Sequence, residues 1–345
     1  MKLIRKEDGA GGKYMMDFLK KHVISRFDSK AGEIALSDFE DSSDFDKYAF
    51  TTDSYVVNPP VFPGGSIGGL AVCGTSNDLA VLGAKPAVMS MSLIIQDGFS
   101  LKTLDWILDD MAKWLKKIDA KIITGDTKVV EVGIGIAVNT TGIGLRNEHL
   151  EKNLSVVREY RDYPHSWVRD SGLADGDAII ITGNIAEHAA AIMAGRGGFG
   201  FELDVRSDVY PVWLFLRYAL ETGGITAMKD PTRGGVAAVL NEMAEKSGIG
   251  ILVEEEKIPM KDDVKSFCNV LGLDPLIMAN EGKVVMGVVA DQAEDVLKAL
   301  KRAGQKNAAI VGRATSEYEE VVIETSIGTR KILPPPTADP IPRVC

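Results

Sequence analysis

The first half of the chain alternates between strand-like and helix-like spacing of its apolar residues. Four segments combine β-branched or aromatic residues with apolar and polar positions in turn, and each predicts a strand: Tyr48 to Val57, Ala87 to Ile95, Lys121 to Thr124 and Val132 to Thr140. Between the second and the third segment, apolar residues recur at every third or fourth position from Leu104 to Ile118. That spacing predicts a helix over about residues 101–118, so the first half is expected to form an α+β domain.

The second half predicts a further α+β unit after an irregular connection. The charged stretch from Arg146 to Asp170 shows no clear apolar period, and the expected strand Asp177 to Thr182 follows it. We therefore place a domain boundary near residue 155. This division gives an N-terminal domain of residues 1–155 and a C-terminal domain of residues 156–331.

Turn and cap residues outline the helices of the second unit. Asn184 is a candidate cap for a helix that has Glu187 three positions further on and Gly195 at its end. Another helix is expected after Gly235, with one apolar face and a stop at Gly248. Three further apolar segments predict strands, at residues 250–253, 283–290 and 309–311.

The last segment, residues 332–345, differs from both units. It holds five of the fourteen prolines of the chain, so it cannot form a helix. In a polyproline II conformation, at about 3.1 Å per residue, the chain from Leu333 onward would carry Cys345 about 37 Å. We expect a mobile, proline-rich tail that reaches more than one site, with an ordinary frayed terminus as the alternative.

Composition and charge narrow the class of protein. The 345 residues are 45% hydrophobic and 26% charged, which is enough for substantial cores. A formal net charge of -10 argues against a nucleic-acid or anionic-membrane surface, because both would repel the chain. No apolar run approaches the roughly 20 residues of a membrane span, and Met1 to Lys6 lead into no signal-peptide core, so a cytoplasmic protein is expected.

The three cysteines, Cys73, Cys268 and Cys345, lie far apart and form no CxxC pair. Their spacing suggests neither a disulfide framework nor a zinc site. Cys73 and Cys268 stand in apolar surroundings and are expected to be core residues. Cys345, the last residue, is the unusual one, and we expect it to act as a covalent carrier.

Two segments are candidate phosphate sites. Gly9, Gly11, Gly12 and Lys13 form a glycine cluster in which backbone N–H groups and one cation can approach phosphate oxygens, although a flexible N-terminal loop is the alternative. The segment Asp230 to Gly235 directly precedes an expected helix, whose N-terminus favours anions. A turn that contains proline is the alternative there.

Three aspartates lie at the ends of predicted elements, each beside small polar residues: Asp53, Asp78 and Asp126. Carboxylates spread in this way suit Mg²⁺, which binds proteins through carboxylates together with substrate phosphates. Asp230 is a further candidate ligand. Each of the first three aspartates taken alone would be interpreted as a turn or capping residue, and only together do they suggest a metal site.

Glu281 lies just before a predicted apolar strand, where burial would raise its pKa and make it a candidate general base. A surface turn explains the same pattern. His188 falls in the helix expected after Asn184, and a structural role is expected for it.

These motifs together resemble the HypE family of hydrogenase maturation factors, which are carbamoyl dehydratases of the PurM-like superfamily that contains aminoimidazole ribonucleotide (AIR) synthetase. The acidic and glycine-rich motifs identify the superfamily, and the terminal cysteine identifies the family. One departure is Val344, where isoleucine is expected, but both residues are β-branched. The matching segments are residues 51–54, 62–65, 71–80, 125–130, 230–235, 280–283 and 342–345.

The resemblance implies a two-domain PurM-like (AIR synthetase-like) α+β fold with ATP bound between the domains. It also implies a homodimer whose first domains form a shared β-barrel. A partner, HypF, would pass a carbamoyl group to Cys345, and ATP would drive dehydration of the resulting thiocarboxamide to a thiocyanate. The cyano group would then go to iron on a HypC–HypD complex, for the [NiFe]-hydrogenase centre.

On this resemblance we assign roles to individual residues. Cys345 is the acceptor, Glu281 is the candidate base, and Lys128 is the orienting cation beside it. Mg²⁺ and phosphate binding are assigned to four carboxylates: Asp53, Asp78, Asp126 and Asp230. Further contacts to ATP are assigned to Gly11, Gly12, Lys13, Asn77 and Arg233.

Two other functions fit parts of the sequence. Another enzyme of the superfamily, such as selenophosphate synthetase or thiamine monophosphate kinase, would share the acidic motifs. The first 72 residues hold no cysteine, however, whereas selenophosphate synthetase is expected to carry a reactive one near the N-terminal loop, and a small-molecule kinase has no use for a terminal thiol. The other alternative is a non-catalytic binding protein anchored through Cys345, although one cysteine without nearby histidine makes a poor metal site.

Overall fold

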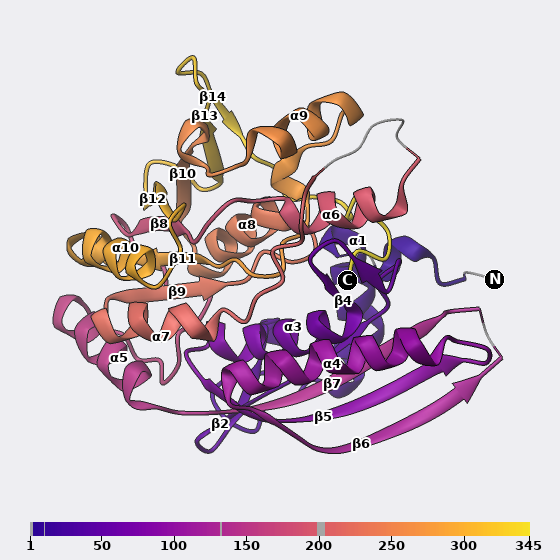
Figure 1. Cartoon of the computed structure of the whole chain (residues 1–345). Coiled ribbons are helices and arrows are strands. Elements are labelled where there is room, and N and C mark those ends of the chain that lie inside the picture. Colours follow the sequence, from indigo (N-terminus) through magenta and orange to yellow (C-terminus); the bar gives the residue numbers. More distant parts are fainter. Residues whose placement is uncertain (1–2, 10, 132, 199–203) are drawn as a thin grey trace.

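The computed structural model describes residues 3–9, 11–131, 133–198 and 204–345, which form two α+β domains side by side (Figure 1). The first domain is built on five strands: β1 (Ser43–Phe45), β2 (Tyr48–Tyr55), β5 (Lys85–Gln96), β6 (Lys121–Val130) and β7 (Ile136–Leu145). They pair in the order β1-β2-β7-β5-β6, and β5 and β6 run parallel whereas the other pairs are antiparallel.

Two helices, α3 (Ile67–Val81) and α4 (Leu101–Ile118), cover one face of this sheet (Figure 1). α3 is buried on nearly all sides because it lies between the sheet, α4 and the second domain. The opposite face of the sheet is largely open, and Phe50 and Ile94 on it are 40% and 43% exposed.

The second domain is built on a seven-stranded sheet in the order β14-β13-β10-β12-β8-β11-β9. Its strands are β8 (Ala178–Ile181), β9 (Ile225–Lys229), β10 (Gly250–Glu254), β11 (Val285–Val288), β12 (Ala309–Thr315), β13 (Val321–Glu324) and β14 (Arg330–Ile332). Its helices are α5 (Glu148–Tyr160), α6 (Glu187–Arg196), α7 (Trp213–Thr222), α8 (Gly235–Ser247), α9 (Asp262–Leu271) and α10 (Ala293–Arg302).

This sheet is buried on both faces, and successive residues of a strand enter two different cores. Ile179 and Ile181 of β8 pack with α6, α8 and α9, whereas Ala178 and Ile180 pack with α5, α7 and α10. The period of two follows from the pleat of a strand. The first core continues into the first domain through α3, so the two domains share it.

The remaining elements are short. They are α1 (Gly12–Leu19), a π-helical turn (Lys20–Ile24), α2 (Ser25–Phe27), β3 (Val61–Phe62), β4 (Gly65–Ser66) and the 3-10 turns Lys6–Gly9, Leu36–Asp38, Glu255–Lys257, Pro275–Ile277 and Ala290–Gln292. No helix in the described parts of the chain is long and apolar enough to cross a membrane.

The elements predicted from the regular apolar patterns of the first half are confirmed. The helix predicted over residues 101–118 has those bounds, and β2, β5 and β6 contain the predicted segments or most of them. The fourth strand begins at Ile136, and Val132, where it was predicted to start, lies outside the described residues. Cys73 and Cys268 are buried core residues, as expected.

Three local predictions in the second half are wrong. The stretch predicted to be irregular contains α5, and residue 155 lies inside this helix, so the exact domain division stays a prediction. The N-cap of α6 is Ala186, with no side-chain hydrogen bond, and not Asn184. α6 also runs through Gly195 to end at Arg196, with Gly197 as its C-cap.

Candidate active site

Four carboxylates from separate elements come together between the two domains. Asp53 lies on β2, Asp78 on α3, Asp230 directly after β9, and Glu281 just before β11. The charge of Asp53 helps to raise the pKa of each of the other three. The structure therefore brings together three of the four predicted Mg²⁺ ligands and the predicted base.

Burial is the largest cause of the raised pKa of Asp78, followed by the charges of Asp230 and Asp53. The pKa of Glu281 is raised by burial and then by Asp230. Thr51 donates a hydrogen bond to Asp78 (2.9 Å), but Asp230 Oδ2 and Glu281 Oε1 are buried without a hydrogen-bond partner among the described residues. Such a cluster is stabilised by added positive charge.

These oxygen donors fit Mg²⁺, a hard cation that usually takes only one or two protein carboxylates and completes its shell with waters and substrate phosphates. Within the described ranges, no group of three or more His, Cys, Asp or Glu side chains is arranged to hold a metal ion alone. A bound cation would compensate the burial of Asp230 Oδ2, which has no hydrogen-bond partner among the described residues.

The last five residues of the chain, 341–345, which we call the arm, are bound beside this cluster. Cys345 is half-buried, and its carbonyl accepts a hydrogen bond from the N–H of Val56 (3.4 Å). The N–H of Asn58 donates to the carbonyl of Arg343 (3.2 Å). The arm is thus docked in this structure, and the mobility expected for the tail stays a prediction.

Two arginines fasten the arm through backbone carbonyls. Arg196, the last residue of α6, donates to the carbonyls of Pro342 (2.6 Å) and Arg343 (2.9 Å). The side chain of Arg343 donates in turn to the carbonyls of Val56 (2.9 Å) and Ile134 (3.2 Å). The arm is therefore held through its backbone carbonyls, through the side chain of Arg343 and through the buried side chains of Ile341 and Val344.

The docked thiol is held in its protonated form. Burial raises the pKa of Cys345 well above its usual range, the charges of Glu281, Asp53 and Asp339 add to the shift, and Arg233 opposes it. The pKa of Arg233 is itself raised, chiefly by Cys345. Arg233 is therefore a cation within electrostatic reach of the thiol, near which negative charge on a group carried by Cys345 would develop.

The predicted glycine loop lies against Arg233 and against the proline-rich tail. Gly11 packs on Arg233, and Gly12 packs on the backbone at Pro336. Gly12 has a φ of +65° and no room for a Cβ, so only glycine fits this contact. Lys13 is exposed on α1, and its approach to phosphates stays a prediction.

Asn77 on α3 connects the two domains. Its amide group donates to the carbonyls of Tyr210 (3.2 Å) and Glu281 (3.1 Å) and accepts from the N–H of Val212 (2.8 Å). Asn77 is fully buried, so it positions the backbone at the candidate base. Its predicted contact with ATP stays a prediction.

Asp126 and Lys128 stand apart from the cluster within one chain. Both lie on β6, the edge strand, which is three strand spacings, or about 14 Å, from Asp53 on β2. They form an exposed ion pair of 2.7 Å, and this contact lowers the pKa of Asp126. Lys128 therefore does not stand beside Glu281 in one chain as predicted, and the nearby cation that lowers the pKa of Glu281 is Arg233.

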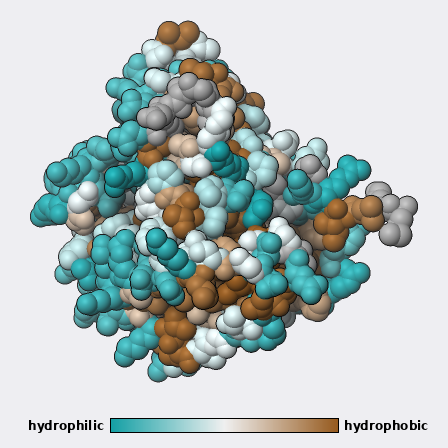
Figure 2. Space-filling view, turned by 45° about the vertical axis from the view of Figure 1, so that its right-hand side comes forward, coloured by the Kyte–Doolittle hydropathy of each residue, from teal (hydrophilic) through white to brown (hydrophobic). Residues whose placement is uncertain are grey.

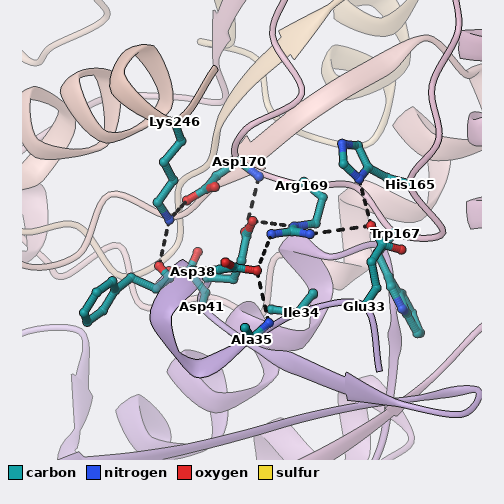
Figure 3. A network of polar contacts seen from close by, with 12 residues as sticks. Glu33, Ile34, Ala35, Asp38, Asp41, His165, Trp167, Arg169, Asp170 and Lys246 are labelled. Atoms are coloured by element: carbon teal, nitrogen blue, oxygen red, sulfur yellow. Dashed lines mark hydrogen bonds and ion pairs between the residues drawn. The ribbon is translucent and has the colours of Figure 1, made fainter. Parts of the chain in front are cut away.

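A network of polar contacts holds residues 33–41 against the second domain (Figure 3). The guanidinium of Arg169 pairs with Glu40 (2.6 Å) and Asp38 (3.0 Å). Burial and the charge of Asp170 nevertheless raise the pKa of Glu40 to about 7, since they outweigh the attraction of Arg169.

The same network reaches the acidic cluster through Lys229, which directly precedes Asp230. Lys229 is buried, and it pairs with Asp41 (2.6 Å) and Asp170 (3.4 Å). Lys246 of α8 also pairs with Asp170 (2.6 Å). The network therefore fixes both domains where their carboxylates meet.

Comparisons with known proteins cover the whole chain. The AIR synthase related protein models match residues 35–146 (N-terminal domain) and 174–324 (C-terminal domain). A hydrogenase expression/formation protein of Methanocaldococcus jannaschii is 47% identical over 100% of both chains. Carbamoyl dehydratase HypE of Escherichia coli is 34% identical over 100% of both chains, and that of Rhizobium leguminosarum is 38% identical over 98% of this chain and 93% of its own. The chain belongs to the HypE family.

Solved structures of HypE align just as fully. A HypE–HypF complex matches with a TM-score of 0.82 at 38% identity, over 92% of this chain and 99% of that chain. HypE in complex with ATP matches with a TM-score of 0.78 at 33% identity, over 99% of this chain and 100% of that chain.

The alternative of a thiamine monophosphate kinase is not favoured. The kinase of Aquifex aeolicus matches with a TM-score of 0.60 but only 16% identity, over 92% of this chain and 97% of its own, which shows the fold alone. The predicted two-domain PurM-like α+β fold is confirmed.

Proposed function

We propose that this HypE-family enzyme carries a carbamoyl group on Cys345 as a thiocarboxamide and dehydrates it to a thiocyanate with ATP. The position of Cys345 carries the proposal, because the docked thiol lies at the acidic cluster, within electrostatic reach of Arg233 and Glu281. Relatives named carbamoyl dehydratase HypE and a HypE structure with ATP support it. A binding protein would have no use for a base at the thiol.

The reaction balances as a phosphorylation followed by an elimination. The oxygen of Cys345–S–C(=O)NH₂ is a poor leaving group, so phosphoryl transfer from ATP first forms a P–O bond to it. The C–O bond then breaks, phosphate leaves with its electron pair, and the nitrogen gives up both protons as the C≡N bond forms. ADP, phosphate and the thiocyanate are the products.

Three carboxylates from this chain are proposed to hold Mg²⁺ and the phosphates: Asp53, Asp78 and Asp230. When bound, Mg²⁺ supplies positive charge that neutralises the phosphates. We assign Gly11, Gly12, Lys13 and Arg233 to the ATP phosphates, since backbone N–H groups and cations neutralise the same charge.

Glu281 is proposed as the base that removes the protons from nitrogen. Its burial and raised pKa give the carboxylate a high proton affinity, and its Oε1 is buried without a hydrogen-bond partner among the residues that the structure describes. Asn77 fixes the backbone at Glu281 through a hydrogen bond to its carbonyl oxygen.

Loading and unloading of Cys345 are proposed to take place with the arm released. The half-buried thiol is protonated while the arm is docked and is then a poor nucleophile, so we propose that it leaves its docked position to accept a carbamoyl group. We propose HypF as the donor, in line with the solved HypE–HypF complex, and a HypC–HypD complex as the acceptor of the cyano group. We expect these steps to be cytoplasmic.

A homodimer is proposed on the open face of the five-stranded sheet. Exposed apolar side chains gather on its strands, and β6 presents an unpaired edge. Figure 2 shows apolar surface along the lower part of the molecule, where Figure 1 places this sheet. The exposed apolar residues on this face include Phe45, Phe50 and Ile94, and Ile123 and Val129 are exposed on the edge strand β6.

In the proposed dimer, Asp126 and Lys128 could contribute to the active site of the partner subunit. Both lie on the proposed pairing edge and away from the cluster of their own chain. We propose that they complete the Mg²⁺ and base site of the second copy, where Lys128 would stand near Glu281 as the resemblance implies.

Mass spectrometry of the intact protein tests the proposed function. Incubation with HypF, carbamoyl phosphate and Mg-ATP should add a carbamoyl group at Cys345 and then convert it to the lighter cyano adduct. Glu281→Gln should accumulate the carbamoyl adduct. No adduct on the wild type, or an adduct that survives Cys345→Ala, would rule out the carrier role.

A further inference from the structure

His188 of α6 touches the arm directly. The side chain is fully buried, with Nδ1 2.7 Å from Ser207 Oγ and Nε2 2.8 Å from the carbonyl oxygen of Val344. A carbonyl only accepts hydrogen bonds, so Nε2 carries the proton and Nδ1 accepts from the Ser207 hydroxyl. Burial lowers the pKa of His188, which agrees with this neutral form.

The same N–H lies near the candidate base. Glu281 Oε1 is 4.0 Å from His188 Nε2, and it is buried without a hydrogen-bond partner among the described residues. The single proton on Nε2 goes to Val344, so Glu281 keeps a free oxygen while the arm is docked. Because both ring nitrogens are occupied, His188 is not itself available to take a proton from the carried group.

We propose that His188 is a positioning residue that holds the Val344 carbonyl and thereby fixes the adjacent Cys345 at Glu281. Val344 is only 2% exposed, so its carbonyl has no ready replacement donor in water when His188 is removed. The chemistry at Cys345 rests on the proposed function, whereas the docking of the arm can be measured without it.

Arg196 provides an internal comparison on the same helix. Its two bonds go to carbonyls of the arm further from Cys345, at a more exposed position. Water can replace an exposed donor, so Arg196→Ala is expected to loosen the arm less than His188→Ala does.

Labelling of Cys345 by iodoacetamide in the full chain, followed by peptide mass spectrometry, tests this role. His188→Ala should raise the labelling rate about tenfold to hundredfold, and His188→Gln, whose amide N–H can replace Nε2–H, should restore most of the protection. Cys73 and Cys268 are buried, so their slow labelling reports that each variant is folded. His149→Ala, in which the ring lost packs against Trp213, is the matched control and should label like the wild type.

An unchanged labelling rate in folded His188→Ala overturns the inference, as does failure of His188→Gln to restore protection. In the dehydration assay, His188→Ala should slow formation of the cyano adduct, and His188→Gln should recover it. If the labelling pattern is as expected but the wild type forms no cyano adduct, the proposed function fails and the positioning role stands.

Discussion

The thiol of Cys345 and the guanidinium of Arg233 lie within electrostatic reach, and each shifts the pKa of the other. Arg233 lowers the pKa of the thiol, but burial outweighs it, so the docked arm favours the protonated thiol. Because the pKa of the thiol is higher in the docked arm than in the free arm, docking is most favourable at pH values below the free pKa, where the thiol is protonated in both states. That preference is lost as the pH rises above about 8.5, the ordinary thiol value.

The labelling rate of Cys345 should therefore keep rising above that pH. A free thiol labels at a nearly constant rate once it is ionised, whereas here each further pH unit also releases more of the arm. Measured by mass spectrometry from about pH 7 to pH 10, the rate should rise throughout. A plateau at the free thiol pKa would contradict the burial argument.

Asp230→Asn should raise the stability of the fold and lower the ATPase activity. Since burial raises the pKa of Asp230, its carboxylate disfavours the folded state at neutral pH, and the variant should have a higher free energy of unfolding than the wild type in urea without Mg-ATP. ATP hydrolysis should fall about a hundredfold or more. Asp126→Asn, at an exposed position, is the stability control, and its free energy of unfolding should not increase. Normal hydrolysis by Asp230→Asn would exclude the metal role.

Mixed dimers test whether Lys128 acts across the interface. Lys128→Ala and Glu281→Gln should each abolish dehydration alone. If Lys128 serves the second copy, a mixed dimer contains one site with both changes and one intact site, so mixing should restore activity. Mixed dimers without activity would contradict the proposed arrangement, provided that subunit exchange is verified with a tagged chain.

The Arg169 network should matter for stability more than for the chemistry. Arg169→Ala leaves Glu40 buried without its closest cation, so the free energy of unfolding should fall by about 3 kcal/mol. Arg169→Lys should lose less, because it keeps the charge but not the fork of donors. The stability of both variants is measured by urea unfolding. An Arg169→Ala variant as stable as the wild type would show that the network does not stabilise the fold.

The accuracy of the sequence-based predictions followed the clarity of the local pattern. α4 repeats apolar residues cleanly over five turns, and its bounds were predictable. α5 has the same spacing at Leu150, Leu154 and Val157 and a cap at Asn147, but charged residues between them obscure it. The N-cap of α6 is Ala186, which makes no side-chain hydrogen bond, so the capping residue suggested by Asn184 misplaced the start of the helix.

The site was predictable in its residue types and only partly in its geometry. Asp53, Asp78 and Asp230 meet because β2, α3 and β9 are packed together by contacts distant in sequence. The position of Lys128 depends on strand order, which no local motif encodes. The role of His188 rests on a backbone carbonyl of the arm, and such contacts leave no motif in the sequence.

The central claim is that ATP removes the oxygen of a group carried on Cys345. The most direct measurement starts from carbamoylated protein with heavy oxygen in the thiocarboxamide, adds Mg-ATP, and analyses the released phosphate by mass spectrometry. We expect one heavy oxygen in each phosphate formed together with a cyano adduct at Cys345. Phosphate that carries only oxygen from ATP and water, while the cyano adduct forms, would contradict the account.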